Sequence, residues 1–465
     1  MESNNKTESV IIQKILMHLI PYLALLYTLN LLDRSNVSLA ALTMQTDLSF
    51  SDKVYGLGAG MFFIGYFIFE VPSNIIMERV GARRWIARIM ISWGIVSVCM
   101  MFIRTPFTFY FLRFLLGVAE AGFFPGIILY LTYWVPAKSR AKVISRFLFM
   151  VAMMGLAGGP LGGLLLKMNG FYGLAGWQWL FLVEGLPSVL LGFTVFYLLP
   201  NGPKEAKWLS DEEKVWIEKS LAEEGEEKDR VQHVSVKKVL SDRRIIHLCV
   251  IFILAVTGGN AIGFFVPKLL KLRSNGEWSD AWVATVGIIP ALVGAIAMVV
   301  ASKHSDRTGN RRAHIAWGYI VAGLAFVYLV FVPKIWGMLG AGQQGSLTEM
   351  FAHMAPMAWM TVSALALNAL GERIAQGSYW ALTSSTMGSK AAPSGIAFIN
   401  SVGGLGGFIG PNLMAELLRR GGGDYFLGLS VATVFVFLAA YMALYLPHST
   451  GGLRKGQKES EPKAS

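Results

Sequence analysis

Apolar residues recur along the chain in stretches of roughly 18–25, and shorter polar segments separate them. An α-helix needs about 20 such residues to cross a hydrocarbon core ~30 Å thick. The pattern therefore predicts an all-α integral membrane protein with twelve transmembrane helices. The predicted spans are 15–42, 55–77, 84–103, 107–132, 142–167, 178–199, 244–267, 281–302, 313–333, 357–387, 395–418 and 425–447.

The longest polar segment divides these spans six and six. Residues 1–199 are predicted to form a first six-helix bundle, and residues 244–447 a second. Residues 200–243 are the linker between them, and the short polar and basic tail at 448–465 is expected to be disordered.

The linker carries the start signal of a helix. Ser210 and Glu213 have the spacing of a capping box, in which each side chain binds the other residue's backbone N–H. The apolar residues Val215, Trp216 and Leu221 follow. Such a helix is either a tether or gate between the two halves or a solvated helix that lies on the cytoplasmic surface.

Composition supports the membrane interpretation. Hydrophobic residues make up 54% of the chain and charged residues only 15%, against about 25% charged residues in a soluble domain. The net charge of +12 suggests a nucleic-acid partner, but 29 of the 41 Lys and Arg lie in the N-terminus, in alternate loops, in the linker and in the tail. Because cytoplasmic loops are enriched in Lys and Arg, this asymmetry argues against nucleic acid and predicts that both termini are cytoplasmic. We expect a multi-pass protein of the plasma membrane, the inner membrane of a bacterium.

The chain shows no signature of an enzyme or of a metal protein. Cys99 and Cys249 both lie in apolar runs, and the seven His are scattered without the spacing of zinc ligands. No nucleophile motif or phosphate-binding glycine loop is present. We therefore predict that the protein is not an enzyme and uses no cofactor or metal.

One stretch, TLNLLDRSN at residues 28–36, places two adjacent charges inside an apolar span. A charge at bilayer depth costs roughly 2.5–3.5 kcal/mol on insertion scales, so it persists only where it faces a cavity or a partner. Adjacent residues on a helix lie about 100° apart, so Asp33 and Arg34 cannot share one narrow stripe. The stretch predicts a polar pathway with this pair at its wall.

The fourth predicted span adds two more charges. Arg113 and Glu120 lie seven residues apart and so on nearly the same helical face. The first span runs in the opposite direction, and the depths of the charges in the two spans overlap. All four groups can therefore meet in one bundle.

These four groups divide by chemistry. Arg34 is the first choice for binding a substrate anion, because a guanidinium stays charged and its planar fork suits a carboxylate. Asp33 and Glu120 are the candidate proton-coupling sites, since a carboxyl group in a water-poor cavity binds protons more readily than in water. Arg113 is expected to hold one of these carboxyl groups in its ionised form. The alternative is an ion-pair network that only ties the first and fourth spans together.

A short motif recurs in both halves, each time after the second span of the half. Residues 77–84 read MERVGARR and residues 305–312 read SDRTGNRR, 228 positions apart. Each copy has an acidic residue, an Arg, a Gly that permits a tight turn and a basic pair. The acid can pair with basic groups on an adjacent helix end and so latch one conformation. The predicted gating residues are Glu78, Arg79, Gly81, Arg83, Arg84, Asp306, Arg307, Gly309, Arg311 and Arg312.

This motif resembles the hallmark loop of the major facilitator superfamily, and the resemblance covers essentially all of residues 15–447. It implies two six-helix bundles around a central cavity, with alternating access. Further stretches resemble the anion:cation symporter family, which carries organic anions such as sugar acids and tartrate, usually with protons. These stretches are LNLLDRSNVSLA (29–40), FFIGYFIFEVPSN (62–74), RFLLGVAEAGFFPG (113–126) and WQWLFLVEGLPSVLLG (177–192). The resemblance implies coupling carboxylates at Asp33 and Glu120 and an anion-binding Arg at Arg34.

Several polar or aromatic span residues are further candidates for substrate contact. Tyr66 is favoured by the resemblance, and Trp380 and Asn400 match positions that resemble the family's substrate contacts. The full set of candidates is Tyr66, Asn260, Gln376, Tyr379, Trp380 and Asn400.

Four other charged residues also lie in predicted spans. Glu70 and Glu184 stand close to prolines and are expected to have structural roles. Glu372 and Arg373 depart from the family, which usually has uncharged residues there. They either tune selectivity toward a more polar substrate or only pair internally.

These features predict a secondary active transporter, a monomer, that imports a small organic anion such as a sugar acid or another carboxylate together with protons. An anion exchanger or uniporter of the same fold is the first alternative, because the superfamily associates a Gly-Pro run in span 5 with exchange and residues 155–163 hold such a run. A transport-dead membrane sensor is less favoured, because the linker at 200–243 is small for a signalling domain. An imposed pH gradient distinguishes symport from exchange, since it drives accumulation only in a symporter.

Overall fold

The structure is a computed structural model that describes residues 2–229, 242–338, 355–386 and 392–446. Within these ranges the chain is helical and has no strand. The predicted tail at 448–465 lies outside the described residues.

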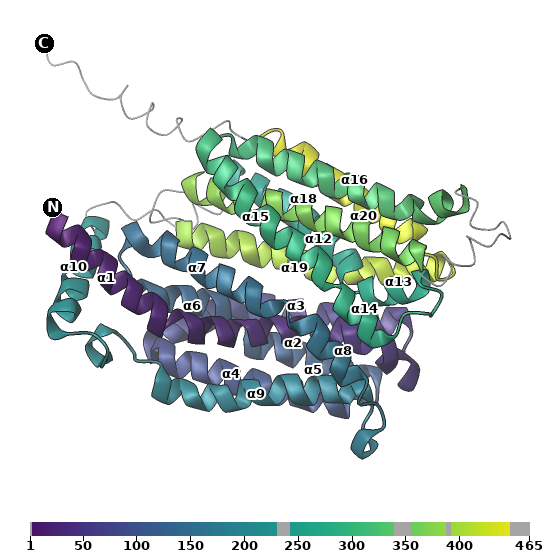
Figure 1. The fold of residues 1–465 in the computed structure, drawn as a ribbon, viewed down its shortest axis with the longest axis horizontal. Helices are drawn as coiled ribbons and strands as arrows, with labels where there is room; N and C mark the ends of the chain where they lie inside the picture. The colour runs from purple at the N-terminus through teal and green to yellow at the C-terminus, as the bar shows by residue number, and fades with distance from the viewer. Residues whose placement is uncertain (1, 230–241, 339–354, 387–391, 447–465) are drawn as a thin grey trace, which may run out of the picture. The chain divides into compact units, whose positions relative to one another are not determined.

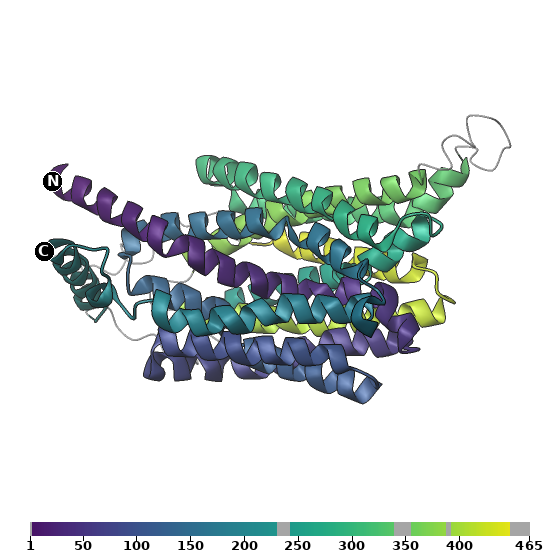
Figure 2. The ribbon, with the colours of Figure 1, turned by 60° about the horizontal axis from the view of Figure 1, so that its bottom comes forward.

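The chain forms two compact units. The first comprises Met1–His233, Phe264–Lys268 and Ser279–Thr285, and the second comprises Val234–Gly263, Leu269–Trp278 and Val286–Ser465. Figure 1 labels the helices, and Figure 2 shows the long helices of the first unit running side by side.

The first unit begins with helices that follow each other through short connections. They are α1 (Glu2–His18), α2 (Ile20–Asp47), α3 (Asp52–Val80), α4 (Ala82–Cys99), α5 (Pro106–Glu120), α6 (Phe123–Thr132), α7 (Ala137–Gly155), α8 (Gly158–Leu166), α9 (Gly176–Leu198) and α10 (Asp211–Asp229). Short 3-10 helices cover Met100–Phe102, Phe171–Gly173 and Pro203–Glu205.

The second unit is built from longer helices. They are α12 (Arg243–Gly263), α15 (Ile288–Thr308), α16 (Arg311–Met338), α18 (Pro356–Thr386), α19 (Ala392–Arg420) and α20 (Phe426–Ala443). The two short helices α13 (Val266–Arg273) and α14 (Asp280–Val286) are each divided between the units.

Most of the predicted spans correspond to apolar helical segments. Nine segments of the described chain are long and apolar enough to cross a bilayer, and α1 and α2, bent by 42° at their junction, together make a tenth. The predicted spans 357–387 and 395–418 fall on α18 and α19, which have 31 and 29 residues. These two helices are long enough, but charges in α18 and glycines in α19 lower their hydropathy.

The boundaries predicted for the first span are wrong. The span was expected to cover residues 15–42, but α1 ends at His18 and α2 runs from Ile20 to Asp47. Pro21 lies in the first turn of α2, where its missing N–H and fixed φ favour the start of a new helix. The apolar residues before this point therefore belong to a separate helix.

The fourth predicted span is broken directly after Glu120. α5 ends at that residue, and the next residue but one, Gly122, has a φ of 84°. Pro125 has no N–H to offer the carbonyl of Ala121, four residues before it. Ser73 Oγ instead donates a hydrogen bond to that carbonyl at 2.6 Å. The Glu120 carboxyl group therefore lies at an irregular point of the backbone, which a continuous helix would not provide.

Gly122→Ala is expected to destabilise the protein more than Gly170→Ala. Both glycines have a φ of 84°, where an L-residue costs about 1–2 kcal/mol. A Cβ at Gly170 meets nothing within 4 Å, whereas a Cβ at Gly122 lies 2.5 Å from Ser73 Oγ. The difference between the two losses of stability reports the close approach of α3 to the backbone break after Glu120. Thermal unfolding of the purified variants measures this difference. Equal decreases in Tm would contradict this account.

The helix predicted in the linker is α10, and its first turn has the predicted capping box. Glu213 N–H donates to Ser210 Oγ at 3.3 Å, and Ser210 N–H donates to Glu213 Oε2 at 2.9 Å. The same carboxylate accepts hydrogen bonds from Lys14 Nζ of α1 at 2.7 and 2.8 Å. His18 of α1 also stacks on Trp208, with ring centroids 4.6 Å apart. These contacts join α10 and the segment directly before it to α1, beside which α10 lies in Figure 1.

The contact between Lys14 and Glu213 is expected to weaken in acid. Burial favours a higher pKa for Glu213, but the hydrogen bonds from Lys14 and Ser210 outweigh it and hold the pKa of this carboxyl below its usual range. A carboxyl whose pKa falls on folding stabilises the folded state above its unfolded pKa, about 4.3, and this contribution is lost as the pH falls through the folded pKa. Amide exchange in α10, corrected for its intrinsic rate, should therefore accelerate as the pH falls below about 4.3.

Lys14→Gln should reduce this pH dependence, because the hydrogen bonds between Glu213 and Ser210 remain. At pH 7 it should raise exchange in α10 by the equivalent of about 0.2–1 kcal/mol, because the pair is partly exposed to solvent. Lys214→Gln is the matched control, since Lys214 pairs with the exposed Asp211 on the same helix. An unchanged acid response in Lys14→Gln would argue against a role for this contact.

Candidate functional site

The four charged side chains predicted in the first and fourth spans lie in the interior of the first unit. Asp33, Arg113 and Glu120 have 0%, 1% and 0% of their surface exposed. The Arg34 side chain is 27% exposed. Arg34 is therefore the most exposed member of this charged cluster.

Arg34 pairs with Glu120 and lies over two aromatic rings of α3. Its Nε donates to Glu120 Oε1 in an ion pair. Its Cζ is 4.7 Å from the centroid of the Tyr66 ring and 5.2 Å from that of Phe62. Stacking of this kind holds the planar fork of an arginine in one orientation. Arg34 Nη2 is buried and has no hydrogen-bond partner among the described residues, so one donor of the guanidinium is unused in this arrangement.

Asp33 is bound on a different side of α2, as expected for a neighbouring position on a helix. Its Oδ1 accepts hydrogen bonds from Ser97 Oγ of α4 and, at 2.9 Å, from Asn36 Nδ2. Its Oδ2 has no hydrogen-bond partner within the described ranges. Asp33 therefore keeps one free oxygen that can take a proton.

Arg113 is anchored to backbone rather than to a carboxylate. Its guanidinium donates to the carbonyls of Gly58 and Ala59 in α3, at 3.4 and 3.2 Å. It interacts electrostatically with Asp33 and Glu120, but the described residues form no ion pair with it. Its expected role, to favour the ionised form of these carboxyl groups, stays a prediction and would act through its field.

Several polar partners in this cluster were not predicted from the sequence. Asn30, Asn36 and Ser97 are buried beside the charges, and the side-chain oxygen and nitrogen of Asn30 have no hydrogen-bond partner within the described chain. Asn30 and Asn36 stand three residues before and three residues after Asp33, so all three share a face of α2. This spacing was the signal that would have identified the two amides.

The substrate-contact candidates of the second half lie in α12, α18 and α19. Tyr379 is fully buried, and its hydroxyl donates to the Leu248 carbonyl at 2.8 Å. With Trp380 and Phe252 it forms an aromatic cluster with ring centroids 5.1, 5.3 and 5.4 Å apart. Contact between the Tyr379 hydroxyl and a substrate requires the bond to Leu248 to open.

The amides among these candidates are engaged to different degrees. Asn260 Nδ2 donates to the Val256 carbonyl of its own helix at 3.0 Å. Gln376 Oε1 accepts from Arg373 Nη1 at 2.6 Å. Asn400 lies half-buried in α19. The roles of these residues in binding stay predictions.

Glu372 and Arg373 do not form an ion pair with each other in the described chain. Arg373 binds Gln376, and Glu372 lies against Gly259 of α12, where an added Cβ would be 2.7 Å from Glu372 Oε1. The acid therefore occupies space that a glycine leaves open in α12.

The repeated motif forms tight turns in both units. Gly81 and Gly309 have φ values of 94° and 67°, as the predicted turns require. In the second copy Asp306 pairs with Arg311 across the turn at 3.8 Å. In the first copy Arg83 pairs with Glu205 beyond α9, at 3.2 Å.

Two basic residues of the second copy also bind backbone. Arg311 Nη1 donates to the Ala381 carbonyl at 3.0 Å, and Arg312 Nη1 donates to the Leu446 carbonyl at 3.3 Å. The second copy thus links the start of α16 to the ends of α18 and α20. A role of both copies as latches stays a prediction.

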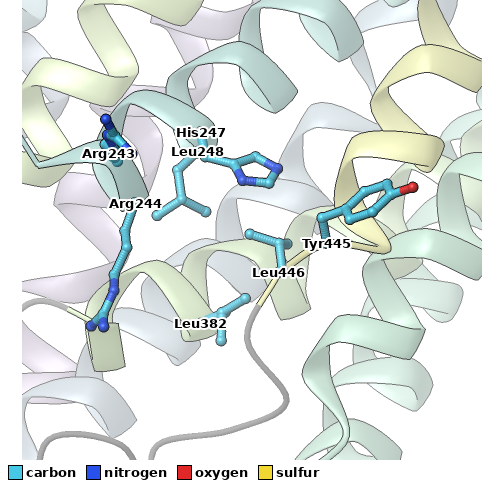
Figure 3. A pocket seen from close by; sticks show the side chains of 7 residues that line it. All are labelled: Arg243, Arg244, His247, Leu248, Leu382, Tyr445 and Leu446. Carbon is cyan, nitrogen blue, oxygen red and sulfur yellow. The ribbon is translucent and has the colours of Figure 1, made fainter.

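A separate hollow of about 290 Å³ lies in the second unit (Figure 3). Figure 3 shows Arg243, Arg244 and His247 of α12 on one side and Tyr445 on the other. None of the predicted substrate or coupling residues lines it. The described residues also contain no group of three or more His, Cys, Asp or Glu that could hold a metal ion. The charged cluster of the first unit is therefore the candidate site.

Comparison with known proteins identifies the family. A profile of the Major Facilitator Superfamily matches residues 23–411. The chain is 40% identical over 440 residues to an Agrobacterium vitis protein named "Putative tartrate transporter", with 94% of this chain and 95% of that protein covered. It is 36% identical over 439 residues to the "Quinolone resistance transporter" of Acinetobacter baumannii, with 94% of this chain and 95% of that protein covered.

A solved structure supports the same fold. It is the crystal structure of a bacterial homologue of the human lysosomal transporter Spinster, in an inward-facing and occupied conformation. The two structures match with a TM-score of 0.70 and a sequence identity of 16%, and the match covers 96% of this chain and 99% of that chain. The family inferred from the sequence motifs is confirmed. The chain belongs to the Major Facilitator Superfamily of membrane transporters, and it is not an enzyme.

Proposed function

We propose that the protein imports a small organic anion together with protons by alternating access. The observation that carries this proposal is the ion pair between Arg34, which is partly exposed, and Glu120, which is fully buried. The relative whose name refers to tartrate, a dicarboxylate, supports a carboxylate as the substrate.

The anion-binding step follows from the chemistry of Arg34. A substrate carboxylate can take the place of Glu120 on the guanidinium, because both groups match its planar fork. Tyr66 and Phe62 keep the guanidinium over their rings during this exchange. Small carboxylates are the class that this site suits.

The proton step follows from the burial of Glu120. When substrate takes Arg34, the carboxylate of Glu120 loses its cation in a site without solvent. An unpaired buried charge costs several kcal/mol, so Glu120 takes up a proton from water as the substrate binds. When the substrate leaves on the other side, Glu120 gives this proton to water and pairs with Arg34 again. Asp33, with its free Oδ2, is the second proton site.

The proposed architecture follows the superfamily. Twelve spans form two bundles, at 1–199 and 244–447, with both termini and the linker at 200–243 in the cytoplasm. The bacterial origin of the named relatives supports the inner membrane as the location. The protein acts as a monomer, because each chain carries its own charged cluster.

Transport in proteoliposomes tests the proposal. A thermal-shift screen of purified protein against tartrate, sugar acids, aromatic acids and a quinolone acid first identifies a ligand. Uptake of the best ligand is then measured with an inward proton gradient and with no other driving force. Accumulation above equilibrium supports symport, and its absence together with rapid counterflow rejects symport in favour of exchange or uniport.

Exchange is the second candidate because of the backbone between α7 and α8. The helix breaks there, and Gly158 and Pro160 begin α8. The superfamily associates a Gly-Pro run at this place with exchangers. The same uptake experiment separates the two functions.

A further inference from the structure

A third carboxyl group lies next to the proposed coupling sites. Glu184 of α9 is 4% exposed, and it interacts with Asp33 and with the side chain of Asn36. Among the charged groups of α2, α4 and α8, against which α9 packs, Asp33 is the one that acts on it. No cation of the described chain forms an ion pair with Glu184.

The charges around it do not balance if all acids are ionised. Glu120 is paired with Arg34, and Asp33 interacts with Arg113. Glu184 is left as a third carboxyl group without a cation. Two neighbouring carboxylates in a dry site cannot both stay ionised at low cost. The remaining buried acid of the first unit, Glu70, has a partner of its own and acts on Tyr66.

The unpartnered hydrogen-bonding atoms around Glu184 also indicate that it is protonated. Asn36 Nδ2 donates to Asp33 at 2.9 Å, which leaves Asn36 Oδ1 as an acceptor. In the described structure neither this oxygen nor Glu184 Oε2 has a hydrogen-bond partner. An ionised carboxylate cannot donate, but a protonated one has a single O–H to give. A proton on Glu184 would therefore fill the acceptor on Asn36.

We propose that Glu184 stays protonated throughout the transport cycle and donates its O–H to Asn36 Oδ1. Asn36 is thereby fixed so that its amide N–H points at Asp33. Glu184 is a positioning residue for Asp33, and it keeps the charge of the cluster low enough for Asp33 to gain and lose a proton. The effect on transport rests on the proposed function, but the protonation of Glu184 does not.

Infrared spectroscopy tests the protonation directly. The difference spectrum between wild type and Glu184→Gln at pH 7 should contain the carbonyl stretch of a protonated carboxyl group. This band should persist up to the highest pH at which the protein stays folded. A difference spectrum that shows only the bands of a carboxylate would overturn the proposal, whether or not the protein turns out to be a symporter.

Transport variants test the positioning role. Glu184→Gln keeps a donor for Asn36 and should leave the pH midpoint of gradient-driven uptake within about 0.3 unit of wild type. Glu184→Leu lacks the donor and should shift this midpoint by about one unit while counterflow continues. Asn36→Leu should give a similar shift, and the double variant should show no further shift, because both changes break one hydrogen-bonded chain.

The outcomes separate the alternatives. Loss of gradient-driven uptake in Glu184→Gln would mean that the proton on Glu184 is itself transported, and would overturn the positioning role. If Glu184→Leu fails to fold, the transport of Glu184→Gln still tests the positioning role, and the infrared band still tests the protonation of Glu184. If wild type shows counterflow but no proton-driven uptake, the proposed symport is rejected. The infrared band still tests whether Glu184 is protonated.

Discussion

Arg34→Lys is expected to weaken substrate binding by roughly a hundredfold and to reduce uptake to background. The guanidinium can give two parallel hydrogen bonds to a carboxylate, whereas an ammonium offers a point charge without the fork. Losing one charge-assisted hydrogen bond costs about 1.5–3 kcal/mol. Lysine also cannot stack flat on Tyr66 and Phe62, which lie 4.7 and 5.2 Å from the Arg34 Cζ.

Ligand-dependent thermal shift and uptake both measure this effect. The ligand-induced increase in Tm should disappear in Arg34→Lys, while the variant without ligand should unfold close to the wild-type temperature because the charge opposite Glu120 is kept. Arg104→Lys is the matched control, since Arg104 is an exposed residue in the loop before α5. Ligand binding of wild-type strength in Arg34→Lys would remove Arg34 from the substrate site.

The charged cluster could be located from the sequence because burying a charge in an apolar span is costly and therefore informative. Asp33, Arg34, Arg113 and Glu120 stood out for this reason, and the period of the helix placed the last two on one face. The structure brings all four into one interior. The family could be inferred from the sequence because each motif residue has a physical role, either as a glycine in a tight turn or as a charged side chain.

The pairing within the cluster could not be predicted in the same way. Whether Glu120 binds Arg34 or Arg113 depends on a few ångströms of helix position and on side-chain rotamers. The break after Glu120 depends on a combination of Gly122, Pro125 and the hydroxyl of Ser73, which is distant in the sequence. A hydropathy pattern averages over such local geometry and so shows one continuous span.

Aromatic residues were ambiguous for a different reason. Tyr66 and Tyr379 are both tyrosines in apolar helices, and either could pack or bind. In the structure Tyr66 lies under Arg34, and Tyr379 is buried with its hydroxyl bonded to Leu248. Only the neighbours of each ring distinguish the two, and these neighbours come from other helices.

Glu120→Gln is expected to abolish proton-driven accumulation while it strengthens substrate binding. The glutamine cannot carry a transported proton, so the substrate gradient can no longer follow the proton gradient. It also removes the carboxylate that occupies Arg34 in the absence of substrate, so substrate no longer has to displace a competing anion. Affinity should therefore rise several-fold while net accumulation falls to equilibrium.

Asp33→Asn separates the second coupling site from the first. It should lower accumulation by the share of one coupled proton, but affinity should stay near that of wild type, because Asp33 binds Ser97 and Asn36 and does not pair with Arg34. In wild type a gradient of one pH unit supports about tenfold accumulation for each coupled proton when the membrane potential is clamped. Both variants should retain counterflow, which needs no net proton movement.

Proteoliposomes with internal and external pH set separately measure accumulation and counterflow on the same preparation. Glu277→Gln is the matched control for loss of a carboxylate, because Glu277 is exposed in the loop after α13. Accumulation at the wild-type level in both Asp33→Asn and Glu120→Gln would exclude these carboxyl groups as the coupling sites. Accumulation that is lost together with counterflow in either variant would instead show that the changed residue is needed for the conformational cycle itself.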